Sequence, residues 1–167
     1  LAGIRFKIGP KVVFLAGEGF LGVPAFPAKP EKVEGITVNR AVSRLYILHS
    51  GAWTDRGPGI RDGFRPDIQD GFRSGVPDGT LVGQYVLHYE DGVQETIPVV
   101  WGEDVRNWRT AEGGKPLTRG KVIWTGSSTV REANMIPTLN LYLTVWQNPH
   151  PGKRVVALDC VATTTAA

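Results

Sequence analysis

The chain has 167 residues, of which 41% are hydrophobic and 21% charged, and these proportions fit one globular domain and exclude a disordered segment. The 19 Lys and Arg residues slightly outnumber the 16 Asp and Glu residues, and like charges never gather into a long block. We therefore expect no nucleic-acid partner. No apolar run approaches the roughly 20 residues of a membrane-spanning helix, so we also expect no membrane insertion.

Cys160 is the only cysteine, which excludes an internal disulfide and a cysteine-based zinc site and leaves the cellular compartment open. No charged segment followed by an apolar core opens the chain, so we expect no signal peptide in it. Because the chain begins at Leu1 rather than Met, we expect a piece of a longer protein. We predict a single domain over residues 1–161, followed by a linker-like tail of small residues at 162–167.

Short strands recur along the chain between clusters of Gly, Pro, Asn and Asp, whereas helical periodicity is scarce. The segments rich in Val, Ile, Leu, Tyr and Trp that we predict as strands are residues 11–15, 33–38, 43–49, 82–89, 95–100, 121–125, 139–146 and 154–161. Glu90-Asp91-Gly92 predicts a hairpin, because glycine supplies the positive φ that such turns need. Strands without intervening helices predict an all-β fold, an antiparallel β-sandwich or jelly roll.

Two segments break this rhythm. Residues 17–30 predict an irregular loop, and residues 54–80 predict an inserted loop of about 27 residues, a length that is usually functional or disordered. The longer loop repeats the pattern Asp-Gly-Phe-Arg at residues 62–65 and 70–73. These side chains either offer stacking and charge to a ligand, or the two phenylalanines hold the loop against the domain.

Several residues within the strands have a structural interpretation. Trp124 and Trp146 are predicted to pack in the core, and His49 and His88, near strand ends, to be hydrogen-bonded structural residues. In residues 139–146, Leu and Val alternate with Tyr, Thr and Trp, so both faces of this strand carry large side chains. We therefore predict that its second face is also covered or binds something.

Catalytic chemistry has little support in the sequence. None of the three histidines has the spacing of a metal-ligand set, and no nucleophile motif occurs. Glu103-Asp104 is the best candidate for the two carboxylates of glycoside hydrolysis, but neighbouring side chains on a strand point to opposite faces. We expect a binding protein rather than an enzyme, with a glycan-cleaving enzyme that uses Glu103 or Asp104 as the least favoured alternative.

Tryptophans outside the strands supply the better functional signal. A Trp ring can pack on the C–H face of a sugar while neighbouring charged and amide groups bind its hydroxyls. The residues predicted to bind carbohydrate on this ground are Trp53, Trp101, Trp108, Asp104, Arg106, Asn107 and Arg65. The alternative is that the tryptophans among them only close the ends of the sandwich.

The spacing of Trp101, Val105 and Trp108 is also that of one helical face, so one or two helical turns here would stack the three side chains. In either conformation we expect the polar residues between them, Asp104, Arg106 and Asn107, to lie near the surface.

Four motifs recur in this order in one group of proteins and together extend over about residues 10–161. They are RLYILHSGAW at 44–53, GQYVLHYEDG at 83–92, IPVVWGEDVRNW at 97–108 and WQNPHP at 146–151. Through these motifs the chain resembles the galactose-binding-like β-sandwich domains, carbohydrate-binding modules in character, of bacterial polysaccharide-degrading or surface proteins, notably of planctomycetes. The loop at 54–80 is longer than this pattern, so its Phe, Arg and Asp residues inherit no role.

The resemblance implies a jelly roll of about eight strands and a non-catalytic module of a secreted protein, located outside the cell or at its surface. The implied partners are a polysaccharide or oligosaccharide and the other domains of a larger parent protein. We expect no cofactor, although many such domains hold a structural calcium ion. Asn148-Pro149 is interpreted as a turn lock.

Two functions follow as hypotheses. The first is a non-catalytic carbohydrate-binding module that targets its parent protein to a polysaccharide, with the binding face either at the loop end or on the concave sheet. The alternative is a structural or protein-interaction β-sandwich domain that packs against a neighbouring domain or a second copy.

Overall fold

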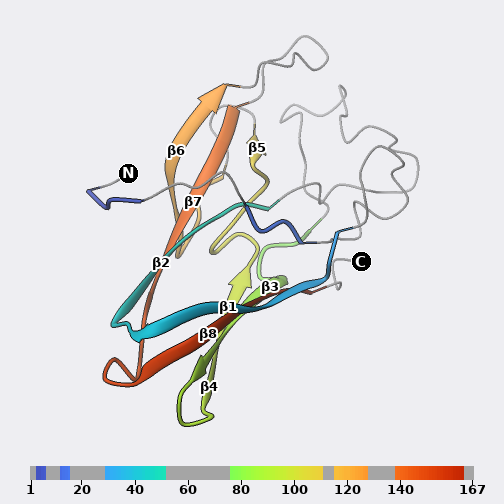
Figure 1. The fold of residues 1–167 in the computed structure, drawn as a ribbon. Helices are drawn as coiled ribbons and strands as arrows, with labels where there is room; N and C mark the ends of the chain where they lie inside the picture. Colours follow the sequence, from blue (N-terminus) through green and yellow to red (C-terminus); the bar gives the residue numbers. More distant parts are fainter. Residues whose placement is uncertain are drawn as a thin grey trace.

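The computed structural model describes residues 3–6, 12–15, 29–51, 76–110, 115–127 and 138–163, and none of these residues lies in a helix. Their strands are, in chain order, β1 (Lys32–Ala41), β2 (Arg44–His49), β3 (Leu81–Tyr89), β4 (Gln94–Val100), β5 (Arg109–Thr110), β6 (Lys121–Ser127), β7 (Thr138–Gln147) and β8 (Arg154–Ala162). The all-β fold class is therefore confirmed (Figure 1).

Seven of the predicted strands correspond to observed ones, and the first does not. Of the predicted strand at 11–15, the described residues 12–15 form no strand, and Val12 is almost fully exposed. An apolar run forms a strand only where a neighbouring strand pairs with it, and within the described residues none does so here. The two-residue strand β5 was not predicted, because it is too short to show a periodicity.

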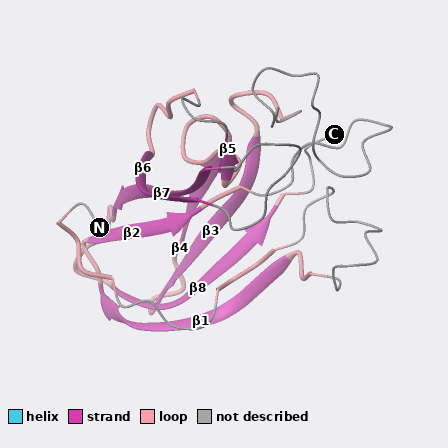
Figure 2. Ribbon diagram, turned by 90° about the horizontal axis from the view of Figure 1, so that it is seen from above, coloured by secondary structure: helices cyan, strands magenta, loops and turns pink. Residues whose placement is uncertain are grey.

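The strands form two antiparallel sheets, which lie as two layers (Figure 2). Sheet A has the order β1-β8-β3-β4. In sheet B, the central strand β7 pairs with β2 and β6, and also with β5 through Leu139 and Thr138. Since β5 and β6 pair with the same two residues of β7, they lie on opposite edges of that strand. Sheet B is therefore three strands wide, with β2 and β5 following one another along one edge. This arrangement is consistent with a β-sandwich.

The core lies between the two sheets in two apolar clusters. The first is built around Trp101, with buried side chains from β4, β7 and the segments beside them. The second is built around Leu87 and includes Trp146 from sheet B, so the prediction that Trp146 packs in the core is confirmed. Tyr85 packs against both clusters, which makes β3 the strand that joins them.

The two chain crossings between the sheets lie together at the lower left of Figure 1. At the β7–β8 crossing, Asn148 donates its Nδ2 hydrogen to Val42 O at 2.7 Å and its backbone N–H to Ser43 O at 3.0 Å. Its Oδ1 accepts from Tyr89 Oη at 2.5 Å and from His150 N at 2.8 Å. The interpretation of Asn148 as a turn lock is confirmed, because its side chain holds both crossings to β3.

The predicted hairpin is also confirmed. Tyr89 N donates to Val93 O at 2.9 Å between β3 and β4, and Gly92 has φ +84°, the conformation for which glycine is suited. At the other end of the chain, β8 extends to Ala162, one residue into the predicted tail. Thr163 is bonded to β3 as well, through its hydroxyl and Leu81 O at 2.6 Å.

Candidate functional site

The segment that carries most of the predicted binding residues is a tight turn between β4 and β5. Glu103 N and Asp104 N both donate to Val100 O, and Gly102 closes the turn with φ +82°. Residues 101–108 form no helix, because the chain reverses after this single turn, and Trp108 is not brought onto one face with Trp101 and Val105. The turn does place Trp101 and Val105 in the same core cluster, as their spacing predicted.

The structure buries three of the predicted binding residues. Trp101 is 1% exposed, Asp104 is 0% exposed and Asn107 is also buried. The expectation that Asp104 and Asn107 lie near the surface is wrong, because the turn folds inward and puts both residues under the edge of sheet B. A β-carbon on Gly51 would lie 3.2 Å from Trp101 Cη2, so the indole reaches the backbone at the end of β2.

The other predicted binding residues have different placements. Trp108 is half-buried, with its backbone N–H donated to Gly51 O at 2.8 Å. Arg106 is also half-buried and binds the carboxylate of Asp78 with both terminal nitrogens, at 2.9 and 3.2 Å. Hydrogen bonds from Arg106 and Lys115 lower the pKa of Asp78 to about 2. Trp53 and Arg65, with most of the 17–30 and 54–80 loops, lie outside the described residues.

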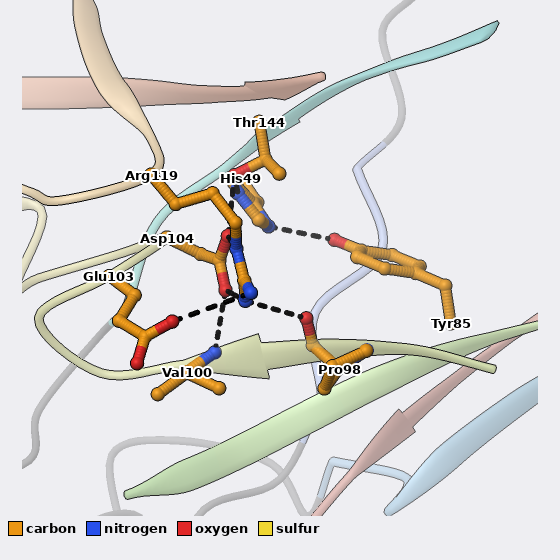
Figure 3. A network of polar contacts seen from close by, with 8 residues as sticks. All are labelled: His49, Tyr85, Pro98, Val100, Glu103, Asp104, Arg119 and Thr144. Atoms are coloured by element: carbon orange, nitrogen blue, oxygen red, sulfur yellow. Dashed lines mark hydrogen bonds and ion pairs between the residues drawn. The ribbon is translucent and has the colours of Figure 1, made fainter. Parts of the chain in front are cut away.

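Asp104 is the centre of a polar network between the sheets (Figure 3). Its carboxylate accepts from Val100 N at 2.8 Å, from Thr144 Oγ1 at 3.1 Å and from Arg119 Nε at 2.6 Å, with a second bond from Arg119 Nη2. Burial alone would raise the pKa of Asp104, but the hydrogen bonds from Arg119 and Val100 outweigh it and hold the pKa below its ordinary value. The carboxylate is thus kept ionised in the interior.

His49 continues the network towards sheet A. Its Nε2 lies 3.0 Å from Thr144 Oγ1 and its Nδ1 lies 3.1 Å from Tyr85 Oη. Because Thr144 gives its only hydroxyl proton to Asp104, His49 Nε2 must be the protonated nitrogen, and Tyr85 must donate to Nδ1. The bonds therefore run in one direction, from Tyr85 through His49 and Thr144 to Asp104.

The contacts of this network link the β4–β5 turn to both sheets. Burial lowers the pKa of His49 to about 4, although the Asp104 charge opposes the shift, so the ring is neutral at pH 7. Asp104 has four donors and is fully buried, and Glu103 lies 3.4 Å from Arg119 Nη1. A general acid or base needs a carboxyl oxygen within reach of substrate, and Asp104 offers none. The prediction that His49 is hydrogen-bonded is confirmed, as is that for His88, whose Nε2 lies 2.7 Å from Asp159.

A second candidate region is the outer face of sheet B. On β7, Tyr142 and Trp146 belong to the core clusters, so the alternate residues Leu141, Leu143 and Val145 point outward. Paired residues of neighbouring strands share a face, and the register therefore places further side chains beside them. The outer face so defined comprises Arg44, Tyr46, Leu48, Lys121, Trp124, Gly126, Leu139, Leu141, Leu143, Val145 and Gln147. Leu143, at its centre, is only 1% exposed and belongs to neither core cluster, so the face is covered there and its exposed side chains lie towards its edges.

Trp124 reaches this face through a β-bulge. The register of β6 on β7 shifts between Val122, which pairs with Tyr142, and Trp124, which pairs with Leu141. Without the extra residue Trp124 would share the inward face of Val122, whereas with it the side chain points outward. Trp124 is 43% exposed, so the prediction that it packs in the core is wrong. The bulge turns the ring outward, and the inward face of β6 is not covered either, since Val122 is 48% exposed.

The indole of Trp124 does not stand out into solvent but runs along its own strand. A β-carbon on Gly126 would lie 2.7 Å from Cζ2 and 3.2 Å from Cζ3 of this ring, and closer still to Cη2. The far end of the ring therefore rests on Gly126, where any larger residue would displace it. At the opposite edge of sheet B, Tyr46 is 40% exposed. The face thus presents two aromatic side chains about 16 Å apart, from their register and the strand spacings.

In comparisons with known proteins, no family model matches the chain, and neither does any curated protein or solved structure. Within the described ranges, no group of three His, Cys, Asp or Glu side chains is placed to hold a metal ion. That same part of the chain contains no helix of the length and apolarity needed to cross a membrane.

Sequence reasoning missed the outer-face residues Tyr46, Trp124 and Gly126, although one signal for them was present. Large side chains on both faces of residues 139–146 predicted that the second face of this strand is covered or binds something. It also missed Arg119 and Thr144, whose roles depend on contacts with a turn that lies far away in the sequence.

Proposed function

We propose that the protein is a non-catalytic carbohydrate-binding module, and that the outer face of sheet B is its binding surface. The observation that carries the proposal is the exposed indole of Trp124, which lies along β6 with its far end against Gly126. Such a ring keeps one face in solvent, and its contact with Gly126 already restricts its rotamers. A sugar that stacks on it therefore costs little additional side-chain entropy. Tyr46 at the other edge supplies a second ring and a hydroxyl.

The width of the surface favours a chain of several sugars over a single one. Trp124 and Tyr46 are about 16 Å apart across the central strand, so only an oligomer contacts both. Contacts with two exposed rings at the edges of the face support weak binding, with dissociation constants of about micromolar to millimolar. We therefore propose a polysaccharide as the ligand, with the module attached to a parent protein outside the cell.

The strand pairing supports a galactose-binding-like jelly roll as the finer fold type. A jelly roll pairs its first strand with its last and its second with the one before the last. The pairs β1 with β8 and β2 with β7 have this pattern. The pairing of β3 with β4 and of β6 with β7 as hairpins departs from this pattern. The jelly-roll proposal therefore rests on the pairing of the first two strands with the last two.

Binding to a panel of soluble polysaccharides, measured by affinity electrophoresis and by tryptophan fluorescence, tests the function and the site. We expect binding that shifts the emission, a loss of at least tenfold in affinity for Trp124→Ala, and no change for Val93→Ala, an exposed apolar control in the β3–β4 hairpin. If Trp108→Ala loses affinity and Trp124→Ala does not, the loop end is the site. The absence of binding to every glycan would overturn the proposed function.

A glycine variant tests the geometry without removing the indole. Gly126→Ala must lift the Trp124 ring from the strand, so we expect it to weaken binding nearly as much as Trp124→Ala. Gly152→Ala is the matched control, because a β-carbon there meets nothing within 4 Å. Equal affinity of the two glycine variants would show that the position of the ring does not matter for binding.

The aliphatic part of the same face favours a second candidate function, assembly with a neighbouring domain or a second copy. Val145 is exposed and pairs with the exposed Tyr46 on the same face, and exposed apolar and aromatic side chains of this kind occur at the centres of protein interfaces. Light scattering over a range of concentrations separates the two functions. A dimer that Val145→Asp dissociates would favour assembly, and a monomer at all concentrations would favour the glycan.

A further inference from the structure

We infer that the ligand of the outer face of sheet B is an anionic polysaccharide, one that carries uronate carboxylates or sulfate esters. The inference rests on the proposed function and adds the chemical class of the glycan. It starts from the distribution of charge between the sheets. The strands of sheet B contain Lys and Arg but no Asp or Glu, whereas those of sheet A contain Glu34, Glu95 and Asp159.

The acidic groups of sheet A are largely neutralised within that sheet. Lys32 Nζ lies 3.0 Å from Glu34 Oε1, and Asp159 accepts from His88 and from Gly35 N at 2.8 Å. On sheet B, by contrast, no carboxylate among the described residues lies within ion-pair distance of Arg44 or Lys121. The outer face of sheet B therefore carries positive charge that the described part of the chain does not balance.

The two cations lie beside the two aromatic side chains. Arg44 and Tyr46 are two residues apart on β2, and the register puts Lys121 and Trp124 on the same face of β6. Each edge of the face thus offers one ring and one cation, and both cations are exposed. Arg44 Nε donates to Gln147 Oε1 at 2.9 Å, which holds the guanidinium over the face and leaves its terminal nitrogens for an anion.

This arrangement matches the two properties of an acidic sugar. The ring of each sugar presents an apolar face for Trp124 or Tyr46, and the carboxylate or sulfate at its edge reaches the neighbouring cation. A neutral glycan would use the aromatic side chains alone. Exposed charges are screened over about 8 Å at physiological ionic strength. The contribution of the glycan's acidic groups to binding affinity should therefore decrease as salt is added.

The experiment compares matched glycans that differ only in charge. The full chain is titrated with polygalacturonate and its carboxyl-reduced form, and with a sulfated galactan and its desulfated form, at low and high salt. We expect both acidic polymers to bind more tightly than their neutral partners, by about tenfold or more, and the difference to shrink at high salt. Preference for the carboxylate or for the sulfate polymer then identifies which anion the face selects.

Variants locate the charge effect. Lys121→Gln and Arg44→Gln should each lower affinity for the acidic polymers about three- to fivefold, and leave the weaker binding of neutral polymers unchanged. Lys32→Gln on sheet A is the control and should change neither. Equal affinity for charged and neutral partners would overturn the inference while the proposed function stands. Failure to bind any of the four polymers would overturn the inference, and the proposed function as well if no glycan of the wider panel binds.

Discussion

The two faces of sheet B use polar chemistry in opposite ways. On the inner face, His49 and Thr144 direct their polar atoms to Tyr85 and Asp104, so each hydrogen bond is made within the chain. On the outer face, Tyr46 and Trp124 are exposed. Arg44 and Lys121 lie beside them, and no carboxylate among the described residues lies within ion-pair distance of these two cations. The same three strands therefore carry one surface whose polar groups are satisfied by the fold and another whose edges present exposed side chains to a partner.

The difference teaches that the richest polar constellation in this molecule is not its best binding site. The network around Asp104 links the β4–β5 turn to both sheets, and a buried carboxylate with four donors has no capacity left for a ligand. Binding instead needs groups that the fold leaves unsatisfied. The predictions below test this division, with changes on the inner face expected to cost stability and changes on the outer face expected to cost only binding.

The largest expected effect is that of removing the cation from the inner network. Arg119→Met leaves the carboxylate of Asp104 buried without its charged partner, and we expect it to lower the free energy of unfolding by about 3–5 kcal/mol. Urea denaturation at pH 7 measures the loss. Arg154→Met is the control, since its pair with Glu90 is exposed and worth about 1 kcal/mol or less. Similar losses in the two variants would contradict the division between the faces.

The second prediction concerns pH. The pKa of His49 is about 4 in the folded protein and 6.5 as a model value for the unfolded chain, so between these values the unfolded chain binds a proton that the folded chain does not. Stability is therefore full above pH 6.5 and falls by about 3 kcal/mol as the pH drops towards 4.

His49→Gln should flatten the stability profile in this window, whereas His150→Gln, which changes a histidine outside the network, should leave it in place. Urea denaturation at half-unit steps of pH measures both. A wild-type profile that is flat from pH 4 to 6.5 would mean that the His49 ring is not held neutral by its burial.

A smaller loss in the free energy of unfolding is expected for Thr144→Val, because valine has nearly the same shape as threonine but lacks the hydroxyl. It leaves His49 Nε2 without its acceptor and Asp104 without one donor, so we expect a loss of about 2 kcal/mol. Tyr85→Phe removes the first donor of the same chain of bonds. If the bonds act as one unit, the double variant should lose less than the two single losses added together, and strict additivity would contradict that reading.

The smallest effect on stability is expected on the outer face. Trp124→Ala removes an exposed ring, so its unfolding free energy should stay within about 0.5 kcal/mol of wild type while glycan affinity is lost. Paired unfolding and binding measurements on this one variant sharpen the comparison. A stability loss of several kcal/mol would show that Trp124 is a packing residue and that the two faces do not differ as described.

Much of the fold followed from local sequence signals. Segments rich in Val, Ile, Leu, Tyr and Trp between clusters of turn residues located β2, β3, β4, β7 and β8 to within about one residue, because such side chains favour strands and Gly, Pro, Asn and Asp favour turns. Gly92 marked the hairpin through its positive φ, and Asn148 marked the crossing through its turn chemistry. These features depend on residues close together in the chain, and local sequence reports them directly.

The candidate site did not follow in the same way. Asp104 was predicted near the surface, and its burial depends on Arg119 and Thr144, which meet it only through the tertiary fold. Trp101 was predicted to bind a ligand, and its burial depends on packing against Tyr142 of β7. Trp124 was predicted in the core because it lies within a strand, but a single extra residue in β6 turns its side chain outward. Strand periodicity cannot reveal such a shift, since the pairing partner defines it.

An all-β chain of short strands, the absence of an internal disulfide and the positions of the main turns could be predicted from the amino-acid sequence, because they depend on composition and nearest neighbours. Which polar groups are satisfied and which tryptophan is exposed to solvent depended on the folded arrangement of the strands. The physical reason is that burial and hydrogen bonding are properties of pairs of residues distant in the chain, and register, which a bulge of one residue changes, sets those pairs.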